Sequence, residues 1–401
     1  MLIMNSIMKQ NNFKKFLIII ILLLGIFSHE LRAQVRTGAD CTEVYMPLIE
    51  GKNIAIVANH TSMIENTHLV DSLISLKVNV VKIFGPEHGF RGDNSDGKLI
   101  EDGIDQHTGL PVISLYGAHR KPSKENLKGI DLVIFDIQDV GLRFYTFIST
   151  MQYVMEACAE YGIDFLVLDR PNPNGFFIDG PVLETEYKSF VGMQPVPVVH
   201  GMTVAEYARM INEEGWLENG IKCKLNWVKC EKWDHRKCYE LPVNPSPNLP
   251  NMVSIHLYPS LCFFEGTIMS VGRGTDFPFQ VYGHPDYPNS GFDYTPRSIP
   301  GVSISPKYLG QKCNGVDLQK FPDDFFHDNA GIVLEWLIDA YNQMENKDAF
   351  FNKYFLKLAG TKKLQEQIEK GSSSLAIRSG WKKDLQKFQK IRKKYLLYRD
   401  F

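Results

Sequence analysis

Short apolar runs alternate with helix-like segments along the first half of the chain, and this alternation constrains the fold more than any other feature. The apolar runs cover residues 53–58, 78–84, 112–116, 132–137 and 165–169, and helix-like segments include residues 67–76 and 146–161. Near-continuous apolar strands separated by helices are typical of a parallel sheet that is buried on both faces. The pattern therefore predicts an α/β fold with a Rossmann-like, doubly wound and mostly parallel sheet.

The length of the chain, 401 residues, suits two domains. A proline-rich stretch at residues 242–250 predicts an extended loop at a domain boundary, because each proline restricts the residue before it to extended conformations. After this loop, helical patterns cover residues 330–343, 349–358, 364–369 and 381–395. We expect residues 34–254 to form a Rossmann-like catalytic domain and residues 255–401 to form a smaller α/β C-terminal auxiliary domain.

The N-terminus has the pattern of a secretory signal peptide. Three lysines precede an apolar run at residues 16–27, and the small residue Ala33 follows it. The run is shorter than the ~20 residues that a membrane-spanning helix needs. We therefore expect residues 1–33 to be removed, and the mature chain to be exported, periplasmic or secreted, with no stable membrane insertion. An uncleaved membrane anchor is the alternative.

Charge and local motifs exclude several kinds of partner. The formal net charge of −2 gives no basic face for nucleic acid. No G-x-G-x-x-G or Walker-type loop appears, so the Rossmann-like layout does not imply a nucleotide. Seven cysteines leave at least one unpaired; Cys223, Cys230 and Cys238 are close enough in sequence for a disulfide, but their spacing matches no common zinc pattern. We predict no metal and no cofactor.

Polar residues follow three of the predicted strands. In sheets of this kind, ligands bind outside the carboxyl ends of the strands. The polar residues at these ends are Glu87 and His88, then Asp136, Gln138 and Asp139, then Asp169, Arg170 and Asn172. The fold would bring these three groups to one edge, although they are far apart in sequence.

Glu87 and Asp136 have the clearest chemical interpretations. A carboxyl group desolvated in a cleft has a raised pKa, which suits a general acid, although Glu87 can equally be a structural acid in a turn. Asp136 lies within an apolar run, where a charge is costly unless it is paired. A structural ion pair between Asp136 and Arg143 is the alternative to a catalytic role. Asp139 would face the same pocket only if the chain turns at Gln138.

Three later residues are further candidates for a binding site. Thr203 and Glu206 fit a helix capping box, which explains Thr203 but leaves His200 free to bind a sugar hydroxyl. Glu265 follows the apolar run 261–264, at the end of a strand-like element. Arg273 lies between two glycines, and its planar guanidinium suits a carboxylate ligand.

Nine short motifs occur in order along the chain. They are FGPEHGF (residues 84–90), SLYG (114–117), FDIQDVG (135–141), RFYT (143–146), LDRPNP (168–173), HGMT (200–203), PSPN (245–248), SVGRGT (270–275) and RKKYLLY (392–398). This set resembles the exo-β-N-acetylmuramidase family of glycoside hydrolases, the NamZ-like proteins, formerly a domain of unknown function. The resemblance covers nearly all of the chain after the expected signal peptide.

The resemblance implies a Rossmann-like domain and a smaller C-terminal domain with the active site between them. It implies hydrolysis of the β-1,4 bond of a non-reducing terminal N-acetylmuramic acid (MurNAc) in peptidoglycan fragments such as MurNAc-GlcNAc, for cell-wall turnover or recycling. Glu87 would be the catalytic acid. The chemistry of glycoside cleavage calls for a second acidic group, which we seek at Asp136, Asp139 or Glu265. Substrate-binding candidates are His88, Gln138, Arg143, Asp169, Arg170, Asn172, His200, Glu265 and Arg273; of these, Arg143 or Arg273 would bind the lactyl carboxylate of MurNAc.

Two other functions fit the same residues. A non-catalytic muropeptide-binding protein can have this fold, because fold does not fix function. A metal-dependent hydrolase acting on the amide or ether group of an amino sugar is the third hypothesis. A turnover assay distinguishes the glycosidase from the muropeptide-binding protein. Sensitivity to a chelator distinguishes the metal-dependent hydrolase from the glycosidase.

Overall fold

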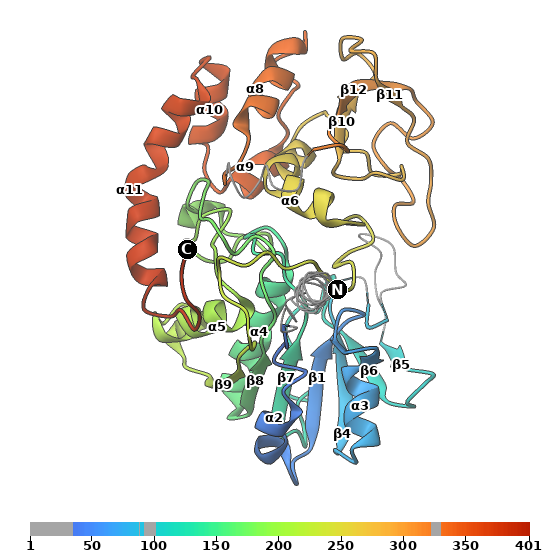
Figure 1. Ribbon diagram of the computed structural model, residues 1–401, viewed down its shortest axis with the longest axis vertical. Helices are drawn as coiled ribbons and strands as arrows, with labels where there is room; N and C mark the ends of the chain where they lie inside the picture. The colour runs from blue at the N-terminus through green and yellow to red at the C-terminus, as the bar shows by residue number, and fades with distance from the viewer. Residues whose placement is uncertain (1–34, 88, 92–101, 322–329) are drawn as a thin grey trace, which may run out of the picture.

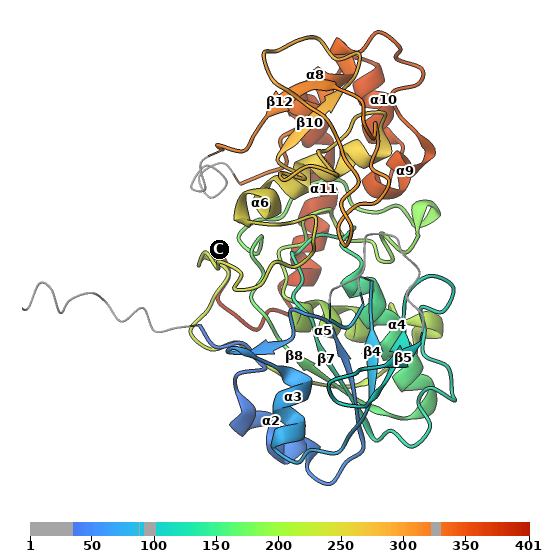
Figure 2. The same cartoon turned by 90° about the vertical axis from the view of Figure 1, so that its right-hand side faces the viewer.

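The computed structural model describes residues 35–87, 89–91, 102–321 and 330–401 (Figure 1). Two units are stacked on each other: an α/β unit, and a mainly helical C-terminal unit above the carboxyl ends of its strands (Figures 1 and 2). The expected signal peptide and His88 lie outside the described residues. Within the described part of the chain, no helix has the length and apolar character needed to cross a membrane.

The main sheet has the strand order of a Rossmann fold. It contains seven strands in the order β5-β6-β4-β1-β7-β8-β9, and all neighbours are parallel except β5 and β6. The strands are β1 (Ile54–Ala58), β4 (Val80–Gly85), β5 (Gly103–Ile104), β6 (Pro111–Ser114), β7 (Leu132–Asp136), β8 (Asp164–Leu168) and β9 (Lys224–Val228). Numbered in chain order, the six parallel strands run 3-2-1-4-5-6 across the sheet. The predicted fold class is confirmed.

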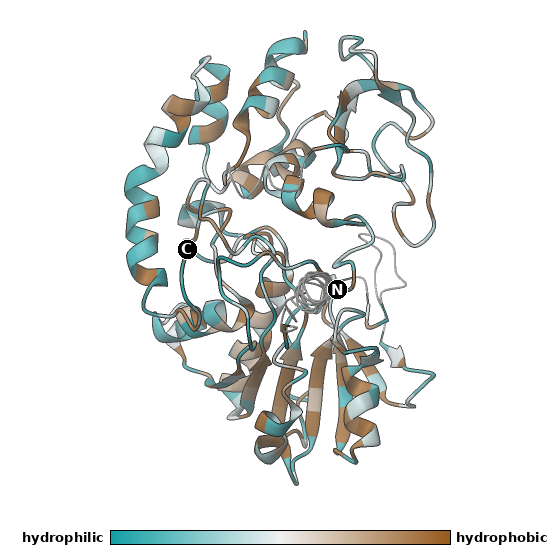
Figure 3. Cartoon of the chain, viewed as in Figure 1, coloured by the Kyte–Doolittle hydropathy of each residue, from teal (hydrophilic) through white to brown (hydrophobic). Residues whose placement is uncertain are grey.

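Alternate residues of the central strands face two separate cores. In β1, Ala55 and Val57 join the core that contains helices α4 (Phe147–Tyr161) and α5 (Val204–Glu213). Ile54 and Ile56 join the opposite core, against α2 (Thr42–Ile49) and α3 (Leu69–Ser75). Because both faces are covered, the central strands are apolar at nearly every position, and they are mostly brown in Figure 3.

The C-terminal unit combines helices with a small antiparallel sheet. The sheet has the order β10-β12-β11, with strands β10 (Val281–His284), β11 (Asp293–Tyr294) and β12 (Cys313–Asp317). The helices are α6 (Met252–Leu261), the 3₁₀ helix η3 (Cys262–Gly266), α8 (Leu334–Gln343), α9 (Lys353–Ala359), α10 (Lys363–Glu369) and α11 (Ser374–Arg392). The four predicted C-terminal helices are present. The short remaining elements are β2 (Met63–Ile64), β3 (Thr67–His68), η1 (Thr185–Tyr187) and η2 (Glu218–Gly220).

Three local predictions can be compared with the structure. The capping box of Thr203 and Glu206 is confirmed at the start of α5. The strand-like interpretation of residues 261–264 is wrong, because this run lies at the end of α6 and in η3. Residues Ser254 to Leu261 of α6 are all buried, so no polar face reveals the helical period. All seven cysteines are free thiols, including Cys223, Cys230 and Cys238.

Candidate active site

A cavity of about 650 Å³ lies between the two units. This volume is in the usual range for a small-molecule site. The α/β unit contributes Glu87, Tyr116, Arg120, Thr146 and Phe190, and the C-terminal unit contributes Tyr258, Glu265, Arg273, Tyr354 and Lys357. The cavity therefore forms at the edge of the sheet where ligands bind in Rossmann-like folds.

Glu87 reaches this cavity from the end of β4. It lies two residues after Gly85, the last residue of the strand, and is partly buried. The Thr146 hydroxyl donates a hydrogen bond of 2.9 Å to Oε2 of Glu87. Thr146 immediately precedes α4, so the carboxylate is oriented by a residue on a rigid element. Within the described part of the chain, no group donates a hydrogen bond to its other oxygen, Oε1, which is therefore available to a ligand.

Glu265 is a second carboxylate in the same cavity. The Arg273 side chain holds it through Nε to Oε1 at 2.7 Å and NH2 to Oε2 at 3.2 Å. The Arg273 guanidinium also lies 4.9 Å from the ring centroid of Phe279. A two-point ion pair fixes both the position and the plane of a carboxylate. Glu265 is therefore anchored at the cavity wall.

Tyr354 on α9 lies within electrostatic range of both acids. Desolvation is the main cause that raises its pKa, and the nearby carboxylates of Glu265 and Glu87 raise the pKa further. The phenol therefore stays protonated at neutral pH. A protonated hydroxyl close to two carboxylates can donate a hydrogen bond to a ligand between them.

Aromatic side chains form much of the rest of the wall. Tyr258 lies 5.5 Å from Phe144 and 4.7 Å from Phe279, measured between ring centroids, both in edge-to-face geometry. Phe190 contributes a further ring at the wall. Aromatic faces cover the apolar faces of sugar rings, and two acids beside such a wall are the parts that glycoside cleavage requires.

Comparison with known proteins agrees with this geometry. The N-terminal model of exo-β-N-acetylmuramidase NamZ matches residues 54–253, and the C-terminal model of the same family matches residues 256–398. The chain belongs to the NamZ family. The resemblance found in the sequence motifs is therefore confirmed.

Relatives of this NamZ-family chain match it over most of its length. The peptidoglycan β-N-acetylmuramidase NamZ of Bacillus subtilis strain 168 is 41% identical over 389 residues, which cover 92% of each chain. Two solved structures of DUF1343-family proteins from Bacteroides fragilis NCTC 9343 share the fold. The first is 48% identical, with a TM-score of 0.86, and the match covers 92% of this chain and 100% of that one. The second is 29% identical, with a TM-score of 0.77 and coverage of 91% and 99%.

The structure brings three of the predicted site residues together. Glu87, Glu265 and Arg273 line the cavity of this NamZ-family chain. His88 lies outside the described residues. The other eight are buried and do not line the cavity: Asp136, Gln138, Asp139, Arg143, Asp169, Arg170, Asn172 and His200.

Asp136 is held in a buried ion pair with Arg170. Nε of Arg170 is 2.6 Å from Oδ1 of Asp136, and NH2 is 2.9 Å from Oδ2. The predicted alternative, an ion pair between Asp136 and Arg143, is therefore wrong. Arg143 instead donates to the backbone carbonyls of Pro181, Val196, Leu358 and Ala359. Because its NH1 and NH2 groups are used in this way, Arg143 ties α9 to the α/β unit.

Gln138 and Asp139 stabilise the loop that follows β7. The Gln138 amide donates to the carbonyls of Asp139 and Pro171, both at 2.8 Å. The Asp139 carboxylate accepts a hydrogen bond of 2.6 Å from the backbone N–H of Gly141. Burial raises the pKa of Asp139 to about 7, although hydrogen bonds from two backbone N–H groups oppose this shift.

Asp169, Asn172 and His200 surround the start of α5. Asp169 accepts hydrogen bonds from the Thr203 hydroxyl at 2.7 Å and from the Tyr398 hydroxyl at 2.6 Å, and burial raises its pKa to about 7. The Asn172 amide donates to a backbone carbonyl. Burial lowers the pKa of His200 to about 3, so the imidazole is neutral. These side chains hold the C-terminal tail and the helix in place.

Sequence reasoning missed several cavity residues. Tyr116, Thr146 and Asn248 line the cavity and lie inside the quoted motifs SLYG, RFYT and PSPN, so the motifs carried a signal for them. Arg120 and Tyr354 lie in no motif, and nothing in their local sequence marks them.

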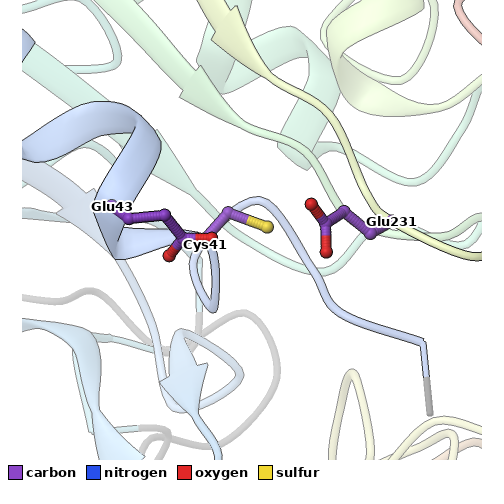
Figure 4. Close-up of side chains that lie close together, drawn as sticks. All are labelled: Cys41, Glu43 and Glu231. Atoms are coloured by element: carbon purple, nitrogen blue, oxygen red, sulfur yellow. The ribbon is translucent and has the colours of Figure 1, made fainter. Parts of the chain in front are cut away.

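Among the residues that the structure describes, one group of side chains has the spacing of a metal site. Ligand atoms of Cys41, Glu43 and Glu231 lie within 4.8 Å of one another (Figure 4). The Arg36 guanidinium, however, bridges the two carboxylates at 2.8 Å and 2.7 Å. Burial raises the pKa of Cys41 to about 11, which disfavours the thiolate that a metal requires. These residues are better described as an ion-pair network, and none of them lines the cavity.

Proposed function

We propose that this chain hydrolyses the β-1,4 bond of a non-reducing terminal MurNAc in peptidoglycan fragments. The chain is a glycoside hydrolase of the exo-β-N-acetylmuramidase family. The observation that carries the proposal is the position of Glu87: a partly buried, oriented carboxylate in a cavity whose walls come from both units. The 41% identity to a peptidoglycan β-N-acetylmuramidase over 92% of the chain supports the substrate class.

Glu87 is the proposed general acid. Cleavage needs a proton for the leaving oxygen and stabilisation of an oxocarbenium-like centre. Glu87 supplies the proton, and Thr146 keeps its carboxyl group in the required orientation. After the bond breaks, the same carboxylate can accept a proton from the water that completes hydrolysis.

Of the three candidates for the second acid, Asp136, Asp139 and Glu265, we propose Glu265. It lines the cavity with Glu87, whereas Asp136 and Asp139 are buried outside it. Held by Arg273, its charge can stabilise the positive centre or orient a water molecule or the 2-acetamido group of the sugar. The Tyr354 phenol is a proposed hydrogen-bond donor to the substrate.

Export to the periplasm or the medium, followed by a role in cell-wall turnover or recycling, is part of the proposal. Its support is the basic and apolar pattern of residues 1–33. Fractionation of cells that produce the full chain, with N-terminal sequencing of the product, tests it. A mature N-terminus near Gln34 in the exported fraction is the expected result, and full-length protein in the cytosol would contradict it.

The central experiment compares wild type with Glu87→Gln on a chromogenic MurNAc glycoside. Loss of the general acid and base should lower kcat by about 10²–10⁴ fold. Binding of MurNAc-GlcNAc should remain, because glutamine keeps the shape of the side chain. Glu231→Gln is the matched control, since Glu231 lies in the Arg36 network outside the cavity and should leave kcat unchanged.

Two outcomes would overturn the proposal. If Glu87→Gln turns over at the wild-type rate, Glu87 is not the acid. If the wild type binds MurNAc-GlcNAc but never releases free MurNAc, the protein is a muropeptide-binding module. Turnover that persists in a strong chelator, with free MurNAc as product, eliminates the metal-dependent hydrolase.

A further inference from the structure

MurNAc differs from N-acetylglucosamine by a lactyl ether that ends in a carboxylate. An enzyme that prefers MurNAc therefore needs a cation in the sugar-binding cavity. Among the described residues, three basic side chains line this cavity: Arg120, Arg273 and Lys357. The structure allows these three to be compared by the partners that each already has.

Arg273 is already neutralised. Its Nε and NH2 groups are both bonded to the carboxylate of Glu265. Arg143, the other arginine expected from the sequence, is buried outside the cavity and donates to backbone carbonyls. Removing either guanidinium from these partners would leave buried polar atoms unsatisfied, at a cost that a ligand carboxylate would have to offset.

Arg120 is placed in the cavity wall without an acidic partner. Its Nε is buried and makes no hydrogen bond, and among the described residues no ion pair is found for its guanidinium. Its Cζ lies 4.1 Å from the ring centroid of Phe190, and that ring is stacked on Tyr153 with an angle of 9° between the planes. The contact with Phe190 restrains the guanidinium at the cavity wall, and a guanidinium that lies over an aromatic ring keeps its N–H groups for hydrogen bonds.

Arg120 also belongs to the same wall as the proposed acid. It follows β6, and β6 is the neighbour of β4, which leads to Glu87. Lys357 projects from α9 in the opposite unit and is exposed to solvent. A hydrated ammonium on a flexible stem is a weaker receptor for a carboxylate than a stacked, planar guanidinium.

We propose that Arg120 binds the lactyl carboxylate and thereby selects MurNAc over N-acetylglucosamine. This inference rests on the proposed function. The carboxylate would accept hydrogen bonds from the free N–H groups of Arg120 and would supply the negative charge that this guanidinium lacks. Arg120 is therefore a specificity-determining residue, distinct from the acids that carry out the cleavage.

The test uses two chromogenic glycosides that differ only in charge. One carries MurNAc, and the other carries MurNAc with its lactyl carboxyl group converted to the amide. Wild type should prefer the acid over the amide by about 10–100 fold in kcat/KM, the range for a hydrogen bond to a charged group. Arg120→Gln should abolish that preference, because it should lower kcat/KM for the acid and should change kcat/KM for the amide much less. Arg120→Lys should keep part of it.

Controls separate this inference from folding and from the proposed function. Arg209→Gln removes another stacked guanidinium, 4.7 Å from the Trp227 ring and outside the cavity, and should keep the wild-type preference. Thermal unfolding of each variant checks that it is folded. If wild type hydrolyses neither glycoside, the proposed function itself fails. If wild type hydrolyses both equally well, or if Arg120→Gln keeps the preference while Lys357→Met loses it, the assignment of Arg120 is overturned and the proposed function stands.

Discussion

Replacing Asp136 by asparagine tests whether this residue serves stability or chemistry. Asp136 is completely buried, and both of its oxygens accept hydrogen bonds from Arg170, which is itself only 4% exposed. In Asp136→Asn, the amide oxygen could still accept one hydrogen bond from Arg170, as the Met63 carbonyl does at 2.9 Å, but the Arg170 charge would remain buried without a negative partner. Breaking a buried ion pair on one side costs about 3–5 kcal/mol of folding free energy.

This cost converts into a measurable change in melting temperature. Unfolding entropy is about 2 cal/mol/K per residue, which gives roughly 0.8 kcal/mol/K for a chain of 401 residues. The melting temperature of Asp136→Asn should therefore fall by about 4–6 °C. Because Asp136 does not line the cavity, kcat measured well below the transition should stay close to the wild-type value.

The assay pairs thermal unfolding with turnover of a MurNAc glycoside. Glu87→Gln should show the opposite pattern, an unchanged melting temperature with turnover lost. The double variant Asp136→Leu/Arg170→Met should recover much of the lost stability, because it leaves no buried charge without a partner. If Asp136→Asn has the melting temperature of the wild type but has lost turnover, Asp136 takes part in the chemistry and the structural interpretation is refuted.

Two further predictions follow from single contacts. Because burial raises the pKa of Asp139 to about 7, the stability from its protonated form is complete below about pH 4 and is lost as the pH rises through 7. Asp139→Asn should therefore match wild type in urea unfolding near pH 4 and be more stable at pH 8; an equal difference at both pH values would contradict this. Thr146→Val removes the hydrogen bond to Glu87 and should lower kcat about tenfold, with Thr146→Ser restoring most of it; a kcat equal to wild type in the valine variant would show that the bond does not position the acid.

The central sheet could be predicted because its sequence is dominated by one physical requirement. Strands covered on both faces must be apolar at nearly every position, and β1 and β7 are fully buried. The edge strands β5 and β9 were not predicted. β5 has only two residues, and in β9 most positions are exposed or partly exposed, so neither has an apolar run. The pairing that places β9 beside β8 is a tertiary contact that local sequence does not contain.

The candidate site was only partly predictable, because position in sequence does not say which side chains pair. Glu87, Asp136 and Asp169 all follow or end apolar strands, and sequence patterns treat them alike. Their partners distinguish them. Arg170, which neutralises Asp136, lies 34 residues further on, and Tyr398, which binds Asp169, lies 229 residues further on. Glu87 keeps an uncharged partner and a place in the cavity wall.

The buried polar residues nevertheless matter for the site, since they set the relative position of the two units that form it. Arg143 donates hydrogen bonds to the carbonyls of Leu358 and Ala359 at the end of α9. The same helix contains Tyr354 and Lys357, which line the cavity. Arg392 of α11 donates to the carbonyl of Gly201, next to the start of α5. Glu87 of the α/β unit and Glu265 of the C-terminal unit can act on one substrate only if the relative position of the two units is fixed. Many of the family's motif residues can therefore be explained as positioning groups, and the chemistry depends on the few that remain in the cavity.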